Sequence, residues 1–312
     1  MLTMELTTWD GGRYKLPTLI SWDFICTGSV PCDSFSAVCL YDRSMADVLP
    51  RAVGFTALDG GQIVLRGVVD AYEISMSSKG LLVSLEGRGM AALLLDNEST
   101  AVTYGEALLP EILKNHVEPY KIDCTVSDKI PGIPYKVPSG SSQWSALRGY
   151  IHRAAGFDPY FTRGGTLVIG RLWGSGQTIS LEDDDPILSL SKREQRYGVI
   201  SEVLIQDKTQ RVRRRVMNEP FASQGGCRRH VLYMPRSTMD QWRYTGEYQI
   251  QRSAQGQVEL TLVLPSAFAA FPGDRVSLRS RRLGLSETYD VISCRSLMDG
   301  KGETSTLTLS VR

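Results

Sequence analysis

Alternation of apolar and polar residues is clearest over Gln62–Glu98, and we take this stretch as the centre of the fold. It predicts one strand, a second strand, a tight turn at Ser78-Lys79-Gly80, a third strand and a short helix, because period-2 alternation is typical of half-buried strands. Over 90–97 the apolar residues become consecutive and are strong helix formers, so we expect the helix there. Nothing in the stretch is chemically reactive, which indicates a surface that packs rather than a site that reacts.

The residues before this stretch, Leu16 to Leu58, have the pattern of short strands separated by turn signals. Asp59-Gly60-Gly61 predicts a hairpin connection, because glycine supplies the positive φ that such turns need. Roughly five to seven strands in under about 100 residues predict a small barrel or curled sheet capped by the 90–97 helix. We expect this first β-barrel to occupy residues 1–98.

A helical stripe of apolar residues runs through Thr103 to Pro119. Thr103 and Glu106 have the spacing of a capping box, although Pro110 then falls inside the predicted helix. The helix is therefore predicted with an open starting point.

A second helix is predicted over Ser142 to Ala155, with Gly156 at its stop. A hairpin follows, with its turn at Arg163-Gly164-Gly165. Together these elements predict a mixed α/β middle domain at residues 99–190.

Strand patterns dominate from the acidic turn at 182–186 to the end of the chain. We expect a second β-barrel with additional strands at residues 191–312. The fold class predicted for the whole chain is mainly β, with two β-barrels and an inserted mixed α/β domain. The predicted strands are ILSLS, GVISEVLIQD, QRVRRRV, RHVLYM, GEYQIQRS, QVELTLVL, RVSLRS, TYDVISCRSLM and TSTLTLSV.

Two distant segments resemble each other. Val69 to Gly80 (VDAYEISMSSKG) and Val291 to Gly302 (VISCRSLMDGKG) align without a gap, and Val, Met, Lys and Gly coincide. Two generic hairpins would produce such an echo, and so would two copies of one barrel in a single chain.

Composition excludes several classes of protein. The net charge of +1 implies no bulk attraction to nucleic acid or to an acidic membrane. The six cysteines lack C-x-x-C spacing, so neither a disulfide framework nor a zinc site is predicted, and a reducing compartment is the simplest interpretation. Met1 to Lys15 lacks the apolar core of a signal peptide. No apolar run approaches the roughly 20 residues that span a bilayer, so we expect no membrane anchor.

Candidate reactive side chains are few. His116 and His152 lie beside apolar stripes on predicted helices, where surface or capping roles are expected. Cys227 precedes a cluster of cations that would lower a thiol pKa, but on a strand Cys227 and His230 would point to different faces. The acidic turn at 182–186 could hold a hard cation, yet it lacks the ligand spacing of a calcium loop and fits a solvated turn.

One basic run stands out, formed by Arg211, Arg213, Arg214 and Arg215. On a strand, Arg211, Arg213 and Arg215 share a face. They form a solvated or inter-subunit face, or they contact nucleic acid in a lumen without reading its sequence. Since nucleotide, zinc-protease and hydrolase motifs are missing, we predict no enzyme, no cofactor and no metal site.

A resemblance to a known family is carried by GVVDAYEISMSSKGLLVSLEGRGMAALLLDNE and by three further stretches. They are PCDSFSAVCLYD upstream, SSQWSALRGYIHRAAGFDPYFTRGGTLVIGR in the middle and RYGVISEVLIQD at 196–207. Together they resemble the phage tail hub proteins, which include the baseplate hub of contractile tails, the late-control protein D group and relatives in Gram-positive prophages.

The resemblance implies a homotrimer in which each chain supplies two tail-tube-like β-barrels. Three chains would form a ring of six barrels, and this symmetry adaptor would join the hexameric tail tube to the trimeric spike or tip. Other baseplate proteins would be partners, and DNA would pass only as non-specific cargo. Assembly would take place in the host bacterial cytoplasm and the finished protein would belong to the virion. The family supplies no catalytic residues to transfer.

Two other functions stay open at this stage. One is a sequence-independent nucleic-acid-binding β protein that uses the arginines of 211–215. The other is an enzyme with a site assembled across residues 100–190, acting on cell-wall polymer, which would need a pair of carboxylates such as Asp183 and Asp185.

Overall fold

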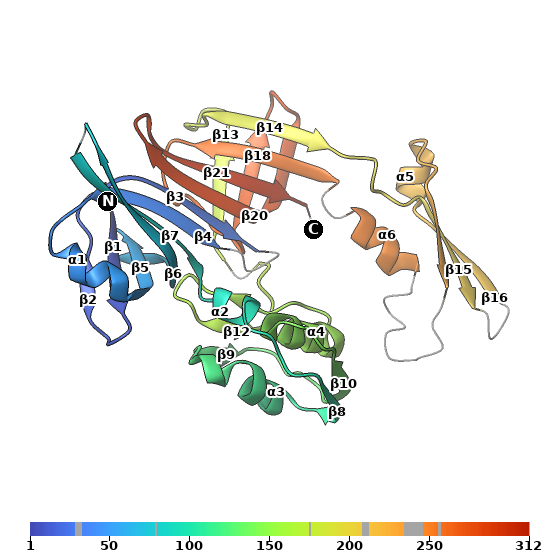
Figure 1. Cartoon of the computed structure of the whole chain (residues 1–312). Coiled ribbons are helices and arrows are strands. Elements are labelled where there is room, and N and C mark those ends of the chain that lie inside the picture. The colour runs from blue at the N-terminus through green and yellow to red at the C-terminus, as the bar shows by residue number, and fades with distance from the viewer. Residues whose placement is uncertain are drawn as a thin grey trace.

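One large sheet runs through most of the protein. The computed structural model describes residues 1–28, 33–78, 80–174, 176–207, 212–233, 246–254 and 257–311. Thirteen strands form the sheet in the order β14-β18-β21-β20-β3-β4-β7-β6-β5-β1-β2, with β19 paired to β13 and β20 (Figure 1). The fold class predicted from the sequence, mainly β with a mixed α/β middle segment, is confirmed.

The first half of this sheet, the first β module, surrounds one apolar core in which alternate residues of each strand are buried. The long alternating stretch that the sequence singles out is one continuous strand, β6, rather than two, and the strand β1 at the start of the chain is an addition to the prediction. The elements are β1 (Leu2–Thr8), β2 (Arg13–Lys15), β3 (Leu19–Thr27), β4 (Ser34–Leu40), α1 (Met45–Val48), η1 (Leu49–Arg51), β5 (Ala52–Asp59), β6 (Gln62–Ser77) and β7 (Gly80–Gly89).

The second half, the second β module, has its own apolar core. Its strands are β13 (Thr178–Glu182), β14 (Ser189–Glu194), β18 (Val258–Leu264), β19 (Arg275–Ser280), β20 (Leu285–Asp299) and β21 (Gly302–Ser310).

The two modules repeat one topology. Strands that follow each other as β3, β4, β5, β6 and β7 lie side by side as β3-β4-β7-β6-β5, and β14, β18, β19, β20 and β21 lie as β14-β18-β21-β20-β19, with every pair antiparallel. The modules differ outside these strands, because β1 is antiparallel to β5 whereas β13 is parallel to β19.

The central hairpins of the modules match in detail. The ladder of β6 and β7 shifts register between Val69 and Ala71, and that of β20 and β21 shifts between Val291 and Ser293. Gly80 and Gly302 begin the return strands with φ of 110° and 112°, a conformation that favours glycine. These positions coincide in the sequence echo, so the echo marks two copies of one module.

Antiparallel pairing between β20 and β3 joins the modules, and we call this pairing the internal joint. Trp22 and Phe24 of β3 pack against Phe268, which comes from the loop before β19, with ring centroids 5.2 and 5.6 Å apart. Arg295 of β20 forms an ion pair with Asp23 of β3 at 2.6 Å. The joint is therefore both a backbone ladder and an aromatic core.

The middle domain lies between the modules in the chain and packs around a separate core. Its long helix α4 is confirmed, with Ser142 accepting a hydrogen bond from the Ser145 backbone N–H and Gly156 ending the helix at a φ of 76°. The elements are α2 (Ala92–Leu95), β8 (Val102–Ala107), α3 (Leu109–His116), η2 (Glu118–Tyr120), β9 (Cys124–Val126), β10 (Ile133–Val137), α4 (Gln143–Ala155), β11 (Tyr160–Phe161) and β12 (Leu167–Ile169).

The capping-box spacing of Thr103 and Glu106 does not start a helix, because both residues lie in the strand β8. The helix α3 begins later, and Pro110 occupies its first turn, where its missing N–H has no helical partner to lose. The β11–β12 hairpin predicted around Arg163 is confirmed.

A small lobe is inserted between β14 and β18 and stands away from the modules (Figure 1). The predicted strand GEYQIQRS is wrong, because it forms helix α6, which packs Ile250 against the small core of the lobe. In a segment of eight residues that alternate in polarity, periodicity alone cannot distinguish a strand from a helix. The lobe contains β15 (Glu202–Asp207), β16 (Val212–Met217), α5 (Glu219–Ser223), β17 (Arg229–Tyr233) and α6 (Gly246–Ala254).

Candidate assembly interface

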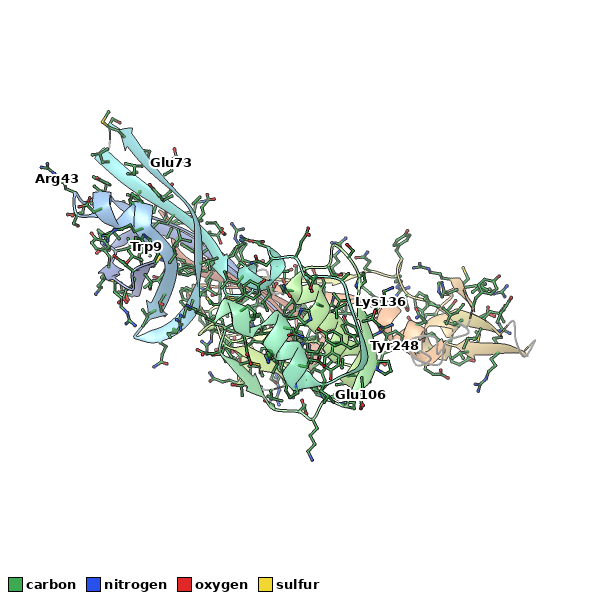
Figure 2. The ribbon with its side chains drawn as sticks, turned by 60° about the horizontal axis from the view of Figure 1, so that its bottom comes forward. Trp9, Arg43, Glu73, Glu106, Lys136 and Tyr248 are labelled. Atoms are coloured by element: carbon green, nitrogen blue, oxygen red, sulfur yellow. The ribbon has the colours of Figure 1, made fainter. Side chains whose placement is uncertain are left out.

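The half of β6 beyond the register shift, together with the start of β7, forms a projecting hairpin that we call the arm (residues 71–82). Within the described chain, β6 pairs with β5 only up to Val68, and from Ala71 onward it pairs only with β7. Its outer edge is therefore an unpaired strand edge, which natural proteins normally cover. Glu73 lies on the part of the hairpin that projects beyond the body of the first module (Figure 2).

Apolar side chains are exposed along the arm. Tyr72, Ile74 and Met76 have exposed fractions of 42%, 45% and 83%, and Leu81 on the return strand has 42%. These side chains stand on alternate residues of β6, so Tyr72, Ile74 and Met76 share one face. An unpaired edge combined with a row of exposed apolar residues is typical of an interface with another protein surface.

The same positions are covered in the second module. By the echo, Tyr72 corresponds to Cys294 and Ile74 to Ser296, and these two residues of β20 are 2% and 1% exposed, on a strand whose edge is paired with β3. Cys294 packs in the core of the second module, and the Ser296 hydroxyl accepts a hydrogen bond from the Phe268 N–H. In the first module, the edge that corresponds to the internal joint thus lacks the strand that β3 supplies in the second. The sequence predicted half-buried residues here, and the only signal for their exposure is the echo itself.

The second module has the complementary feature. Its strand β14 corresponds to β3, since both pair with the strand next to the central hairpin, but in the described chain β14 pairs only with β18. Five of its six residues are exposed and Leu190 is half-buried. Each module therefore carries an open edge next to its central β strands, that of the arm in the first module and that of β14 in the second.

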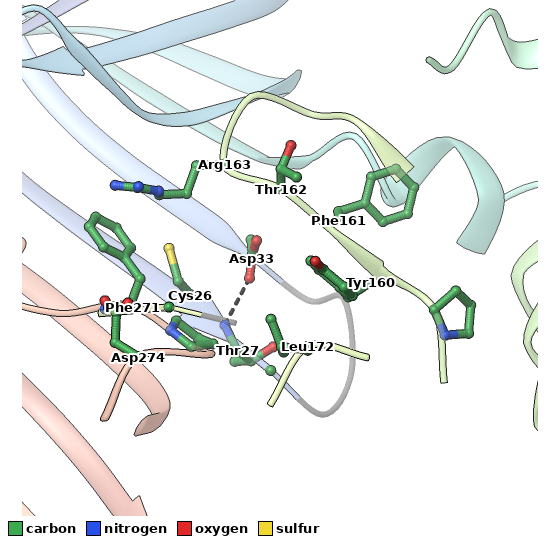
Figure 3. A pocket seen from close by; sticks show the side chains of 14 residues that line it. Cys26, Thr27, Asp33, Tyr160, Phe161, Thr162, Arg163, Leu172, Phe271 and Asp274 are labelled. Atoms are coloured by element: carbon green, nitrogen blue, oxygen red, sulfur yellow. Dashed lines mark hydrogen bonds between the residues drawn. The ribbon is translucent and has the colours of Figure 1, made fainter. Parts of the chain in front are cut away.

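A cavity of about 250 Å³ lies where the two modules meet the middle domain (Figure 3). It is lined by the end of β3, by the β11–β12 hairpin and by the loop before β19. The guanidinium of Arg163 stacks on the Phe271 ring at 4.2 Å and ties the middle domain to the second module. A backbone hydrogen bond from Arg66 to Arg163 ties it to the first.

Burial shifts the pKa of two titratable groups in this cavity. Burial raises the pKa of the Cys26 thiol well above its usual value, so the thiol stays neutral. Burial also raises the pKa of Asp33 to about 6, although Asp33 accepts a hydrogen bond from the Thr27 backbone N–H that favours ionisation. Both carboxylate oxygens of Asp274 accept backbone N–H groups, of Gln177 and Phe271, which fixes the turn before β19.

Only part of the predicted basic patch lies within the described residues. Arg211 lies outside the described residues, and Arg213 lies on β16. Arg215, on the same strand, forms an ion pair with Glu202 at 2.7 Å, and Glu202 also binds Arg229 at 2.9 Å. This pairing lies within the lobe, and it neutralises part of the charge that a phosphate backbone would need.

The acidic turn uses its carboxylates to fix the backbone. Asp183 accepts hydrogen bonds from the Ser280 hydroxyl and the Arg281 N–H, and Asp185 accepts one from the Glu182 N–H. Among the described residues, no group of three or more His, Cys, Asp and Glu side chains is placed to hold a metal ion.

The two histidines of the middle domain have structural contacts. Of the surface or capping role expected for His116, the surface role is wrong, because His116 is buried and hydrogen-bonded to Ser99, Tyr104 and Gln143. His152 pairs with Asp158 at 2.8 Å. Burial alone would raise the pKa of Asp158, but hydrogen bonds from His152 and Arg148 lower it to about 2.

Cys227 is free and exposed, in the loop before β17. Among the described helices, none is both long enough and apolar enough to cross a membrane.

Solved structures share this fold over nearly the whole chain. The 43 kDa tail protein of prophage MuSo2 from Shewanella oneidensis has a TM-score of 0.81 at 18% identity, with 98% of this chain and 97% of that chain covered. The tail protein from Neisseria meningitidis MC58 has a TM-score of 0.78 at 17% identity, with 99% and 96% covered.

A third match is the E. coli c3393 protein, described as a component of the type VI secretion system with structural similarity to T4 bacteriophage tail proteins. Its TM-score is 0.54 at 10% identity, with 93% of this chain and 73% of that chain covered. No protein-family model and no curated protein sequence matches the chain. The two modules, the middle domain and the lobe together have the fold of phage tail proteins.

Proposed function

We propose that this chain is the structural hub of a phage tail or of a tail-like injection particle. In this role it is a homotrimeric symmetry adaptor that joins the hexameric tail tube to the trimeric spike or tip. The observation that carries the proposal is the repeated topology of the two β modules within one chain. Similarity in fold to prophage tail proteins and to a secretion-system component supports the same class of particle.

Repetition explains how a threefold assembly could contact a sixfold one. Three copies of a chain with two equivalent modules present six similar surfaces around one axis, whereas the middle domain and the lobe occur once per chain and keep threefold symmetry. The two β modules would face the tube, and the middle domain would lie between tube and spike contacts.

The partners follow from this position. The tail tube protein would bind the ring of modules, the spike or tip protein would bind the threefold side, and other baseplate proteins would surround the hub. DNA would pass through the lumen as non-specific cargo. The protein would be assembled in the host bacterial cytoplasm and would act in the virion, as a structural protein without enzymatic activity.

Quantitative mass spectrometry of purified tail particles tests the proposal. We expect three copies of this chain per particle, and labelling of the chain should mark only the end of the tail that carries the spike. Absence from the particles, or a copy number in proportion to tail length, would contradict the role of a hub.

The alternative, a nucleic-acid-binding protein that uses the 211–215 arginines, is weaker at Arg215 because that side chain is engaged by Glu202.

A further inference from the structure

Three observations above concern the same kind of edge: the internal joint of β3 with β20, the uncovered edge of the arm, and the exposed edge of β14. We propose that β14 of one copy pairs antiparallel with residues 71–76 of β6 in a second copy of this chain. The contact between copies would then repeat the internal joint. The number of copies in the ring rests on the proposed function, whereas this strand pairing does not.

The register of the pairing follows from the repeat. The ladder of Trp22, Ala37 and Leu85 across β3, β4 and β7 corresponds to the ladder of Leu190, Leu262 and Leu307 across β14, β18 and β21. Since Trp22 lies opposite Met298 in the internal joint, Leu190 is expected opposite Met76, the residue that corresponds to Met298. The remaining pairs are Ser75 with Ser191, Ile74 with Lys192, Glu73 with Arg193 and Tyr72 with Glu194.

Two of the five pairs are complementary in this register, whereas Ile74 and Tyr72 lie opposite the exposed, charged Lys192 and Glu194. Met76, which is 83% exposed in one copy, meets the half-buried Leu190. Glu73 meets Arg193 directly across the ladder, where opposite charges stabilise a strand pair. In the internal joint the corresponding outer face carries the ion pair of Arg295 with Asp23. The charges differ between the two joints, but each joint places one acid beside one base.

The contact is head-to-tail, because each copy offers β14 to one neighbour and the arm to another. Such heterologous contacts close into a ring when the rotation between copies permits it. Pairing would satisfy the backbone groups at the outer edge of the arm and at the edge of β14. The ring would alternate internal joints with joints between copies.

Disulfide trapping tests the pairing. In the full chain with the exposed Cys124 and Cys227 replaced by serine, S75C and S191C are introduced separately, and the two proteins are mixed and oxidised. We expect cross-linked dimers from the mixture and none from either protein alone. The chain with both substitutions should give closed cross-linked oligomers. The pair S75C with S189C, shifted by two residues, is the control for register.

Several outcomes would overturn the pairing. Cross-links formed by S75C alone would indicate a two-fold contact, and equal yield from the shifted control would contradict the register. No cross-link at the highest soluble concentration would contradict self-assembly through these edges. If the chain nevertheless occurs in three copies at the tail tip, the hub role survives and only the strand pairing fails.

A charge swap gives an independent readout by native mass spectrometry. E73K and R193E should each reduce the oligomer several-fold, because like charges directly opposite on a strand pair are destabilising. The variant that carries both should restore most of it. E303K is the matched control, because Glu303 is an exposed acid at the corresponding end of the other hairpin. Equal loss with E303K, or no rescue in the variant with both changes, would contradict the proposed contact.

Discussion

The two central hairpins of the protein have the same backbone and opposite surroundings. In the second module, β20 is covered along its later half by β3, and the aromatic residues of the joint pack there. In the first module, the corresponding half of β6 is uncovered and carries exposed Tyr72, Ile74 and Met76. The outer edge of the central hairpin is paired within the chain in the second module and unpaired in the first. This difference indicates that another molecule pairs with the edge in the first module.

The largest expected difference is in the free energy of unfolding that is lost when an aromatic residue is truncated at the internal joint and in the arm. Phe24 is 1% exposed and contacts the rings of Trp22, Phe35 and Phe268. Phe24→Ala should lower the free energy of unfolding by about 3–5 kcal/mol, because it leaves a cavity in the internal joint. Tyr72→Ala in the arm should change it by less than about 0.5 kcal/mol in the isolated chain.

Urea unfolding at a concentration where the chain is monomeric measures both values. Similar losses for the two variants would show that the arm is packed within the isolated chain and is not an open edge.

A smaller effect concerns the connection from β3 to β4 and the corresponding connection from β14 to β18. In the first module, Asp33 closes the connection from β3 to β4, whereas in the second the lobe is inserted there. Because burial raises the pKa of Asp33 from 3.8 to about 6, the folded protein holds this proton more tightly than the unfolded chain. This group therefore stabilises the fold less as the pH rises from about 4 to about 6.

Asp33→Asn removes the ionisation and keeps an oxygen acceptor for the Thr27 N–H. The variant should be more stable than the native protein near pH 8, by at most about 3 kcal/mol, and the gain should fade toward pH 4. Urea unfolding of both proteins across this range checks the sign. A gain that grows as the pH falls would contradict the assigned pKa.

Much of the fold could be predicted from local pattern. Ser142 and Gly156 identify the ends of α4, and the echo of Val69–Gly80 in Val291–Gly302 locates both central hairpins. The error at α6 arose because a short amphipathic segment takes its structure from the surface it packs on, here β15 and β16.

The interface was harder to predict than the fold. Alternation along β6 shows that one face is apolar, but it cannot show whether the covering strand comes from the same chain. Only the pairing of β3 with β20, a contact between residues far apart in sequence, shows what is missing at the arm. The basic run was a candidate binding patch because of its charge, yet Arg215 forms an ion pair with Glu202 within the lobe.

Electron microscopy of the assembled oligomer, at a resolution that separates strands, tests the central claim most directly. We expect a ring of three chains in which six similar β modules alternate, with β14 of each copy beside the arm of the next. A ring in which the two modules of a chain lie at different radii, or an assembly that leaves the arm uncovered, would contradict the account.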